Sequence, residues 1–421
     1  MSNYTKIIIA GIISNFIETF DLALCGLLVF FFAKYLINDV DNGLLIVLVL
    51  LFIGYFTRPL GAMFFGLLSD LLGRKFLLLL STLSMGITTM AISFIPSVSL
   101  FGLNSLIILL CLRVMQNFFC SAEYANSVIY LVESADKIEK GYIGSWAAFG
   151  SMLGFLLASC FVLIVMQLTK IYPHYEWLFW RLPFMFGLFG SIIGLYMRSQ
   201  IPESLEYIIY YASQPKMQFN FLVKYAFYFL LKNKLQALYA ILLSCFGIII
   251  TLQIYIPIQS STQFSMQQLI ISNILSFIII MILSSVFGKL SDKIDRNKII
   301  MIASLLLCCL LKLYFYLLSH DNFLWLLLSH SLISIPAAAY YAILPVILVE
   351  MFPIRVRCTV LAILYATASC FAAGLTLLLA LMLAKQIYYD LISILLIAFL
   401  VICIYILHIQ LFHKQPVLMA A

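Results

Sequence analysis

The chain has 421 residues, of which 65% are hydrophobic and 10% charged, and its mean hydropathy is +1.13. A water-soluble domain has roughly 45–50% apolar and about 25% charged residues. This chain has too little polar surface to cover itself in water, which excludes soluble enzymes, nucleic-acid-binding proteins and disordered chains. The formal net charge of +7 is therefore informative through its position along the chain, as a signal of membrane topology.

The hydropathy pattern predicts an all-α membrane protein with twelve transmembrane helices. A bilayer core about 30 Å thick needs about 20 apolar residues per helix. Apolar stretches of this kind lie at 7–36, 43–68, 76–96, 104–132, 142–168, 178–199, 236–256, 268–288, 298–319, 323–349, 358–384 and 388–412. We expect an N-terminal six-helix bundle (1–200), a cytoplasmic linker with an amphipathic helix (201–234) and a C-terminal six-helix bundle (235–421).

The lysines and arginines are unevenly distributed between the two sides of this topology. If both termini are inside, most of the 24 Lys and Arg residues fall in cytoplasmic segments, and the outer loops hold few of them. Because positive charge accumulates on the cytoplasmic side, we expect a multi-pass protein with both termini in the cytoplasm.

A short pattern of glycine, aspartate and arginine occurs once in each half. The first copy is Gly66-x-x-x-Asp70-x-x-x-Arg74, and the second is Gly288-x-x-x-Asp292-x-x-x-Arg296. Similarly, Leu131-Val132-Glu133 recurs as Leu348-Val349-Glu350. Each element follows the second or the fourth span of its half, on the cytoplasmic side. Parallel six-helix repeats around a central cavity are a transporter architecture, with the substrate near the middle of the membrane.

The first copy closely resembles the loop signature G-x-x-x-D-(R/K)-x-G-(R/K)-(R/K) of the major facilitator superfamily. It reads Gly66-Leu-Leu-Ser-Asp70-Leu-Leu-Gly73-Arg74-Lys75, and Leu71 departs from the usual basic residue. The resemblance implies a cytoplasmic gate that latches the outward-facing state through Asp70 and Arg74. The expected gate residues are Gly66, Asp70, Gly73, Arg74, Lys75, Glu133, Asp292, Arg296, Glu350 and Arg355.

Within that superfamily the chain resembles the metabolite:proton symporters, which include proline/betaine, shikimate, citrate and 2-oxoglutarate permeases. The residues that carry the resemblance are Glu18-Thr-Phe-Asp21, Arg58-Pro59-Leu60-Gly61-Ala62, Trp180-Arg181-Leu182-Pro183-Phe184 and Glu350-Met-Phe-Pro353-Ile-Arg355-Val-Arg357. Asn117 and Ala122 replace family glycines. The resemblance implies a monomeric transporter of a bacterial inner membrane that uses the proton gradient and no cofactor.

Five ionisable side chains lie inside the expected spans of the N-terminal half, namely Glu18, Asp21, Arg58, Arg113 and Glu123. Each costs roughly 2.5–3.5 kcal/mol at a helix centre on insertion scales. They must therefore pair with one another or face water. In a transporter fold, charges near the middle of the membrane indicate a functional site.

Asp21 and Arg113 are the expected proton-coupling pair. Proton–sugar symporters of the superfamily have an aspartate on helix 1 and an arginine on helix 4 at matching positions, and the resemblance implies the same pair here. Burial favours a neutral carboxyl group, whereas a nearby guanidinium favours the charged form. Asp21 could therefore take up a proton on the outside and release Arg113. Glu18, one turn earlier on the same face, is a proton relay or a cation-binding group; the alternative for the pair is a structural salt bridge.

The expected substrate-binding residues are Arg58, Gln116, Glu123, Tyr255, Tyr341 and Tyr365. For the charged residues the alternative is buried structural pairing, and for the tyrosines it is a place in the interfacial aromatic belt. A site with both cations and carboxylates suits a zwitterion or an organic acid better than an uncharged sugar. The leading hypothesis is a proton-coupled importer of a small polar metabolite that works by alternating access.

Other classes of function fit less well. A proton-antiporting exporter of drugs or siderophores is the alternative, but such exporters show a Gly-Pro signature in helix 5, and the stretch Gly144–Gly154 has no proline. The ten cysteines form neither a C-x-x-C pair nor a Cys/His metal spacing, as expected for buried hydrophobic residues. No nucleophile–base pair is visible, so we expect no enzyme, no metal, no nucleic-acid partner, and only a small-molecule substrate and the lipid bilayer as partners.

Overall fold

The computed structural model describes the backbone of residues 3–37, 40–213, 218–260, 264–320, 322–384 and 389–412. Within these ranges, side chains are described except at 3–4, 36, 40–42, 44–45, 252–260, 376–384, 389–396 and 410–412. All regular secondary structure in the described ranges is helical.

The first half of the chain forms six passes, several of which are interrupted. Its elements are α1 (Asn3–Leu27), α2 (Val29–Phe32), η1 (Ala33–Ile37), α3 (Val40–Tyr55), α4 (Arg58–Leu72), α5 (Arg74–Ser93), α6 (Val98–Phe101), α7 (Asn104–Cys120), α8 (Glu123–Glu133), α9 (Lys140–Ile171), η2 (Pro173–Tyr175), α10 (Glu176–Phe179) and α11 (Leu182–Ser199). The expected span 43–68 is divided into α3 and α4. Pro59 lies in the first turn of α4, where its missing N–H leaves no hydrogen bond unmade.

The second half is built mostly from long uninterrupted helices. They follow two short helices, α12 (Leu205–Ser213) and α13 (Phe219–Lys232), which occupy the expected linker. The elements are α14 (Lys234–Ser260), α15 (Met266–Ser291), α16 (Arg296–Leu318), α17 (Phe323–Glu350), η3 (Ile354–Val356), α18 (Arg357–Ala384) and α19 (Tyr389–Phe412). The domain boundaries at residues 200 and 235 stay a prediction.

Eleven helical segments of the described residues are long and apolar enough to cross a membrane. The expected twelfth span corresponds to α19, of which the apolar part Ile397–Ile409 is described. Apolar side chains such as Leu60, Phe94 and Phe189 are exposed on the outside of the bundle, as lipid contact requires. The pattern of spans therefore describes an all-helical membrane protein.

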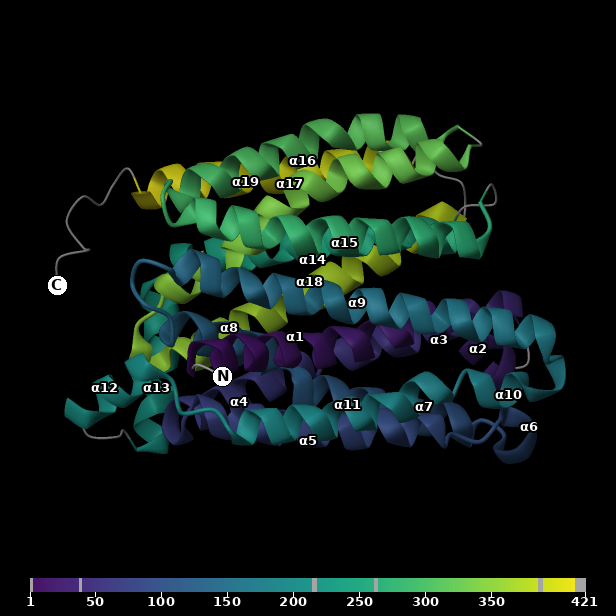
Figure 1. Ribbon diagram of the computed structural model, residues 1–421, viewed down its shortest axis with the longest axis horizontal. Coiled ribbons are helices and arrows are strands. Elements are labelled where there is room, and N and C mark those ends of the chain that lie inside the picture. The colour runs from purple at the N-terminus through teal and green to yellow at the C-terminus, as the bar shows by residue number, and fades with distance from the viewer. Residues whose placement is uncertain are drawn as a thin grey trace.

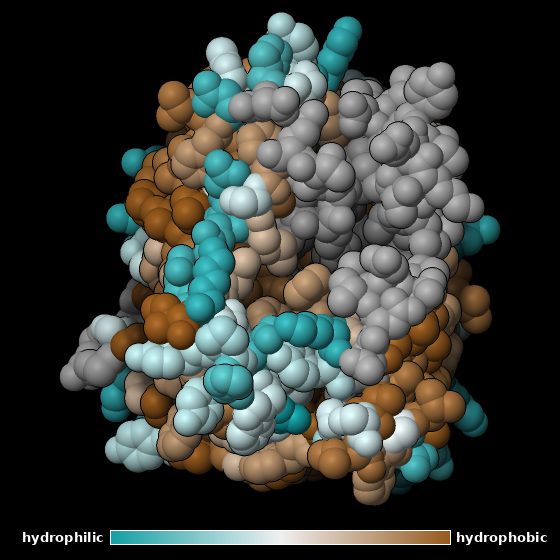
Figure 2. Space-filling view, turned by 90° about the vertical axis from the view of Figure 1, so that its right-hand side faces the viewer, coloured by the Kyte–Doolittle hydropathy of each residue, from teal (hydrophilic) through white to brown (hydrophobic). Residues whose placement is uncertain are grey.

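The helices run side by side along the long axis of the molecule (Figure 1). The start of α1 and the end of α19 lie at one end with α12 and α13, and we call this the terminal end; α2, α6 and α10 lie at the opposite end. Figure 2 looks onto that opposite end, where hydrophilic side chains gather over the middle of the face and hydrophobic ones along its sides. Early and late helices pack most extensively where α9 lies on α15 and where α4 lies on α18.

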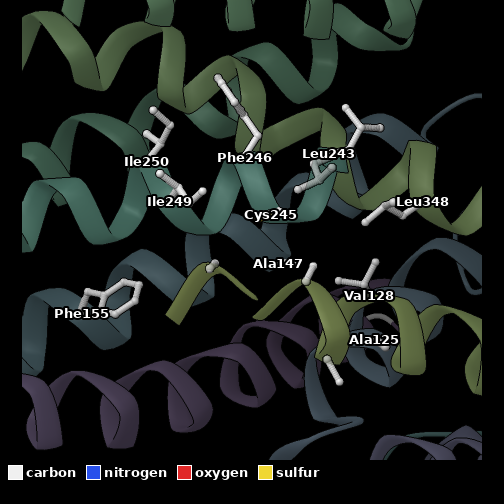
Figure 3. Close-up of a cluster of buried hydrophobic side chains, with 14 of the residues drawn as sticks. Ala125, Val128, Ala147, Phe155, Leu243, Cys245, Phe246, Ile249, Ile250 and Leu348 are labelled. Carbon is white, nitrogen blue, oxygen red and sulfur yellow. The ribbon is translucent and has the colours of Figure 1, made fainter. Parts of the chain in front are cut away.

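A buried apolar cluster joins helices from both halves at the centre of the bundle (Figure 3). Ala147 and Phe155 of α9 and Val128 of α8 lie opposite Phe246 and Ile249 of α14. All five are buried. This cluster holds the helices that surround the central cavity.

Candidate functional site

A cavity of about 250 Å³ lies between the early helices α1, α3, α4, α8 and α9 and the late helices α14, α17 and α18. Along α1 its lining runs from Glu18 to Leu27, toward the end opposite the termini. Four of the expected site residues line it: Glu18, Arg58, Tyr341 and Tyr365. Gln116 and Glu123 are not among the described lining residues, and the side chain of Tyr255 lies outside the described residues.

The charged wall of the cavity is formed by Glu18 of α1 and Arg58 of α4. Arg58 Nη1 lies 3.8 Å from Glu18 Oε1, and both side chains are 6% exposed. Two neighbours orient the guanidinium: its Nε donates to Asn117 Oδ1 at 2.9 Å and its Nη2 to Cys120 Sγ at 3.3 Å. Among the described residues, Glu18 Oε2 has no hydrogen-bond partner. The wall therefore presents a loosely paired carboxylate beside a firmly held cation.

Aromatic rings from both halves complete the cavity. Tyr124 of α8 stacks on Tyr365 of α18 with ring centroids 4.2 Å apart, so this pair bridges the early and late helices. On α17, the Tyr341 hydroxyl donates to Gly247 O at 2.9 Å and shares a hydrogen bond of 2.8 Å with Thr251. Tyrosine faces attract cations, so the cavity combines one carboxylate, one guanidinium and several ring faces.

Asp21 and Arg113 are both buried but do not form a direct ion pair. Among the described residues, no Arg113 nitrogen lies within 4.0 Å of an Asp21 oxygen. A hydrogen-bonded bridge connects them: Thr89 Oγ1 donates to Asp21 Oδ2 at 2.5 Å, Gln116 Nε2 donates to Thr89 Oγ1 at 2.8 Å, and Arg113 Nη1 donates to Gln116 Oε1. Neither Asp21 nor Arg113 is among the described cavity-lining residues.

Gln116 takes part in this bridge. We expected Gln116 in the substrate site; its amide lies between Arg113 and Thr89, and it is not among the described cavity-lining residues, so a contact with substrate stays a prediction. A buried amide must satisfy both its donor and its acceptor, and the bridge does so.

Glu123 is likewise not among the described cavity-lining residues, and its role in substrate binding stays a prediction. Arg198 of α11 donates to Glu123 Oε1 at 2.6 Å, and the Ser81 hydroxyl donates to Glu123 Oε2. Both ionised side chains are at most 1% exposed. A buried carboxylate is stable only beside a cation and further donors, and here these come from α11 and α5 rather than from the cavity.

The first copy of the repeated pattern joins the early and late helices at the terminal end. Asp70, at the end of α4, accepts hydrogen bonds from the Cys358 N–H at 3.2 Å, the Thr359 N–H at 2.9 Å and the Thr359 hydroxyl at 2.7 Å. These donors form the first turn of α18, where unpaired N–H groups and the helix dipole favour an anion. Asp70 therefore caps a helix of the other half.

Arg74 and Glu133 extend this contact into a buried network. Arg74 is 0% exposed and pairs with Asp70 at 2.7 Å and with Glu133 at 3.2 Å. Glu133 also accepts from Arg357 of α18 at 2.9 Å and from the Ser204 hydroxyl at 2.7 Å. Each buried charge in the network thus has at least two partners.

The second copy repeats the geometry with helices exchanged. Asp292, after α15, accepts from the Gly141 N–H at 2.7 Å and the Tyr142 N–H at 2.9 Å, at the start of α9. Arg296 lies 3.2 Å from Asp292 and 2.6 Å from Glu350. The expected gate residues Asp70, Arg74, Glu133, Asp292, Arg296 and Glu350 therefore lie where early and late helices meet.

Comparison with known proteins identifies the family. A profile of the Major Facilitator Superfamily matches residues 11–296 and 239–417. The chain belongs to this superfamily. It is a secondary transporter, a multi-pass membrane protein that carries small molecules, and it is not an enzyme.

Its relatives are bacterial transporters. The proline/betaine transporter of Salmonella typhimurium is 27% identical over 394 residues, which cover 88% of this chain and 76% of the relative. The putative proline/betaine transporter of Staphylococcus aureus is 27% identical over 388 residues, covering 89% and 81%. Both names agree with the predicted resemblance to metabolite:proton symporters, which is confirmed.

Solved structures of the superfamily share the fold. The xylose transporter XylE from E. coli, in a partially occluded inward open conformation, matches with a TM-score of 0.74 and 14% identity, covering 99% of this chain and 100% of that chain. The proton:xylose symporter XylE bound to 6-bromo-6-deoxy-D-glucose gives 0.75 and 16%, covering 96% and 95%. The expected major facilitator fold is confirmed.

In this superfamily member the glycines of the repeated pattern allow close contacts. A Cβ at Gly66 would lie 2.7 Å from the Thr359 backbone. Gly73 has a φ of +109°, which favours glycine, and the turn lets Glu203 accept from the N–H groups of Arg74 at 3.0 Å and Lys75 at 3.2 Å. Glycine is therefore required for geometry at both positions.

The two remaining gate residues have less central roles. Lys75 donates to Ser199 O at 2.8 Å. The Arg355 guanidinium donates to the Tyr210 hydroxyl and lies 5.7 Å from the centre of that ring. The Lys75 contact joins α5 to the end of α11, and the Arg355 contact joins η3 to α12.

Several residues in these contacts were not found from the sequence. Beside the expected gate residues they are Glu206, which pairs with both Lys140 and Arg357, and Tyr207, whose hydroxyl donates to Leu71 O at 3.1 Å. Burial raises the pKa of the Tyr207 hydroxyl, which therefore stays a neutral donor. In the coupling region Thr89 was missed. Its signal was weak, because hydroxyl residues in apolar helices also bond to their own backbone, as Thr88 does.

Among the described residues, no group of three or more His, Cys, Asp or Glu side chains is placed to hold a metal ion. The buried carboxylates are instead paired with arginines.

Proposed function

We propose that this chain imports a small zwitterionic metabolite of the amino-acid or betaine class, driven by the proton gradient across a bacterial inner membrane. The observation that carries the proposal is the charged wall of the cavity, where Glu18 Oε2 has no partner among the described residues and Arg58 Nη1 lies 3.8 Å away. In this assignment both termini, and so the terminal end, are cytoplasmic.

The cavity suits the two ends of a zwitterion. A carboxylate can accept from Arg58, whose Asn117 and Cys120 contacts hold the guanidinium in place. An ammonium group can bind Glu18 and the nearby ring faces of Tyr124 and Tyr365. A cavity of about 250 Å³ favours a small solute. An uncharged sugar would leave Glu18 and Arg58 with only each other as charged partner, at 3.8 Å.

Asp21 and Arg113 are the proposed coupling groups, as the resemblance to proton–sugar symporters implies. Their burial makes a charged carboxylate depend on its partners, so a proton on Asp21 changes the balance of charge behind the cavity. The proton then leaves toward the less acidic cytoplasm when the site turns inward.

The contacts of Asp70 and Asp292 are proposed to be the cytoplasmic gate in its closed state. They bind the first turns of α18 and α9, so they hold the early and late helices together at the terminal end. Opening the cytoplasmic side requires both contacts to break. The names of the relatives and the likeness to a proton symporter support the same function.

The proposal is tested by uptake into proteoliposomes. Radiolabelled proline, glycine betaine, a dicarboxylate and a sugar are compared with and without an inward proton gradient, and with a sodium gradient as a control. We expect accumulation of a zwitterion that requires the proton gradient. Sodium-dependent uptake, or expulsion of solute driven by proton entry, would contradict it, and so would a preference for the sugar.

Arg58→Lys and Glu18→Gln sharpen the test of the substrate site. Lysine keeps the charge but cannot keep the bonds to Asn117 and Cys120 together with the contact to Glu18. We expect both variants to raise the KM for the zwitterion at least tenfold, because a hydrogen bond to a charged group is worth about 1.5–3 kcal/mol. Unchanged KM values would remove these residues from the binding site.

A further inference from the structure

We infer that Thr89 and Gln116 are positioning residues that transmit the protonation state of Asp21 to Arg113. The two charges communicate through a chain of hydrogen bonds instead of a direct ion pair. This inference rests on the proposed proton coupling and adds two residues, on α5 and α7, to which neither the sequence pattern nor the family resemblance assigns this role.

The hydrogen bonds that link Arg113 to Asp21 all run in one direction. Arg113 Nη1 donates to Gln116 Oε1, the Gln116 amide donates to Thr89 Oγ1 at 2.8 Å, and the Thr89 hydroxyl donates to Asp21 Oδ2 at 2.5 Å. Every donor points from the cation toward the anion. Because each bond polarises the next in a medium of low dielectric, the chain is strongest when both ends are charged.

At the anionic end of this series of hydrogen bonds, one carboxylate oxygen is available to bind a proton. Asp21 Oδ1 and Arg113 Nε have no hydrogen-bond partner among the described residues, and both side chains are buried. A proton from the outer solution can therefore bond to Oδ1 while Oδ2 keeps the Thr89 hydroxyl. No other bond breaks in this step, and the charge of the site rises by one.

Protonation weakens the whole chain at once. The bond from Thr89 to a carboxylate is charge-assisted, and such bonds are roughly twice as strong as neutral ones. With Asp21 neutral, Thr89 and Gln116 lose polarisation and Arg113 loses its only nearby anion along this path. The guanidinium is then free to exchange its contacts with Gln116 and Cys25, which lies 2.9 Å from Nη1.

The surroundings of Asp21 make this chain its principal electrostatic contact. Arg113 approaches from α7, and Glu18 and Cys25 are the titratable groups nearest to Asp21 along α1. The other helices packed at this point contribute groups that do not titrate: Thr89 from α5, and Gly187 from α11, where a Cβ would lie 3.3 Å from Asp21 Oδ1.

The test is the pH profile of gradient-driven uptake. Thr89→Val removes the donor to Asp21, so the anion is less stabilised and the proton is held to higher pH. We expect the pH of half-maximal uptake to rise by about 1–2 units, from a charged hydrogen bond and the conversion of 1.36 kcal/mol per unit. Thr89→Ser keeps the hydroxyl and restores the profile.

Thr88→Val is the matched control, because the Thr88 hydroxyl bonds only to the backbone of its own helix, at Ser84 and Met85. It leaves the pH profile unchanged. Solute exchange without a gradient, measured for every variant, shows that the protein is folded and binds substrate.

A double variant tests whether the bonds act in series. Gln116→Met breaks the chain at its middle and shifts the profile in the same direction as Thr89→Val. If the two residues form one path, Thr89→Val with Gln116→Met shifts the profile no further than Thr89→Val alone. Additive shifts, or an unchanged profile in Thr89→Val with normal exchange, would overturn the inference. A wild-type protein without proton-driven uptake would instead overturn the proposed function.

Discussion

The two copies of the Gly–Asp–Arg pattern occupy equivalent positions but differ in burial. In the first copy Asp70, Arg74 and Glu133 are all 0% exposed. In the second, Arg296 is 20% and Glu350 40% exposed, and only Asp292 is largely buried. Water screens an ion pair at the surface, whereas a buried pair keeps its full interaction and its full desolvation cost. The same residues at the same spacing therefore differ in how much interaction free energy they contribute.

Both copies nevertheless make the same type of contact. Each aspartate ends a helix of one half and binds the first turn of a helix of the other half: Asp70 binds α18, and Asp292 binds α9. The carboxylate satisfies N–H groups that the helix cannot satisfy itself. Breaking the contact takes this acceptor away from those N–H groups, so separating the two helices costs free energy.

Removing the first aspartate is expected to have the largest effect. Asp70→Ala deletes four hydrogen bonds and leaves Arg74 with one carboxylate fewer in a buried site, which costs the closed state about 3–5 kcal/mol. Cys358 lies buried directly under this contact and reports opening. We expect its alkylation by a maleimide, measured by peptide mass spectrometry, to become at least tenfold faster.

Asp136→Asn is the matched control, because this exposed carboxylate at the same end forms no side-chain bond among the described contacts. It should leave alkylation of Cys358 unchanged. Asp70→Ala should slow transport without changing which solutes are recognised. An altered substrate range would show that Asp70 shapes the binding site and is no latch.

Removing the second aspartate is expected to have a smaller effect. Asp292→Ala loses two hydrogen bonds at the start of α9 and one partner of Arg296. Loss of a helix cap costs about 1 kcal/mol, so Cys358 alkylation should rise by about fivefold. An effect as large as that of Asp70→Ala would mean that burial does not determine how strongly each copy stabilises the contact between the two halves.

The exposed pair of the second copy is expected to matter least. Glu350→Gln removes a contact of 2.6 Å between partly exposed side chains, worth roughly 0.2–1 kcal/mol. The change in Cys358 alkylation should therefore be less than about fivefold and should vanish in about 1 M salt, where the Debye length is near 3 Å. An effect that persists at high salt would contradict the surface character of this pair.

Much of the contact between the two halves at the terminal end was predictable because its pattern is local. The positions of Asp70, Arg74 and Glu133 follow from a repeated motif, and positive charge marks the side of the membrane. The residues that the motif binds were not predictable, because Thr359 and Glu206 come from distant segments that carry no matching pattern. A helix N-terminus offers backbone N–H groups whatever its side chains are.

The coupling site was predictable as a set of charges but not as a network. An aspartate and an arginine near the middle of the membrane follow from hydropathy and from the family resemblance. Whether they touch depends on helix rotation, which places Gln116 and Thr89 between them. Likewise Glu123 meets Arg198 because α11 brings this arginine beside α8.

The most direct test of the account concerns the carboxyl group of residue 21. Asp21→Asn keeps the shape and the acceptor for Thr89 but cannot exchange a proton. In proteoliposomes with an inward proton gradient, we predict that Asp21→Asn does not concentrate solute, while exchange of labelled for unlabelled solute across the membrane proceeds at a rate close to that of the wild type. Normal accumulation in this variant would contradict the account and leave Asp21 with a structural role.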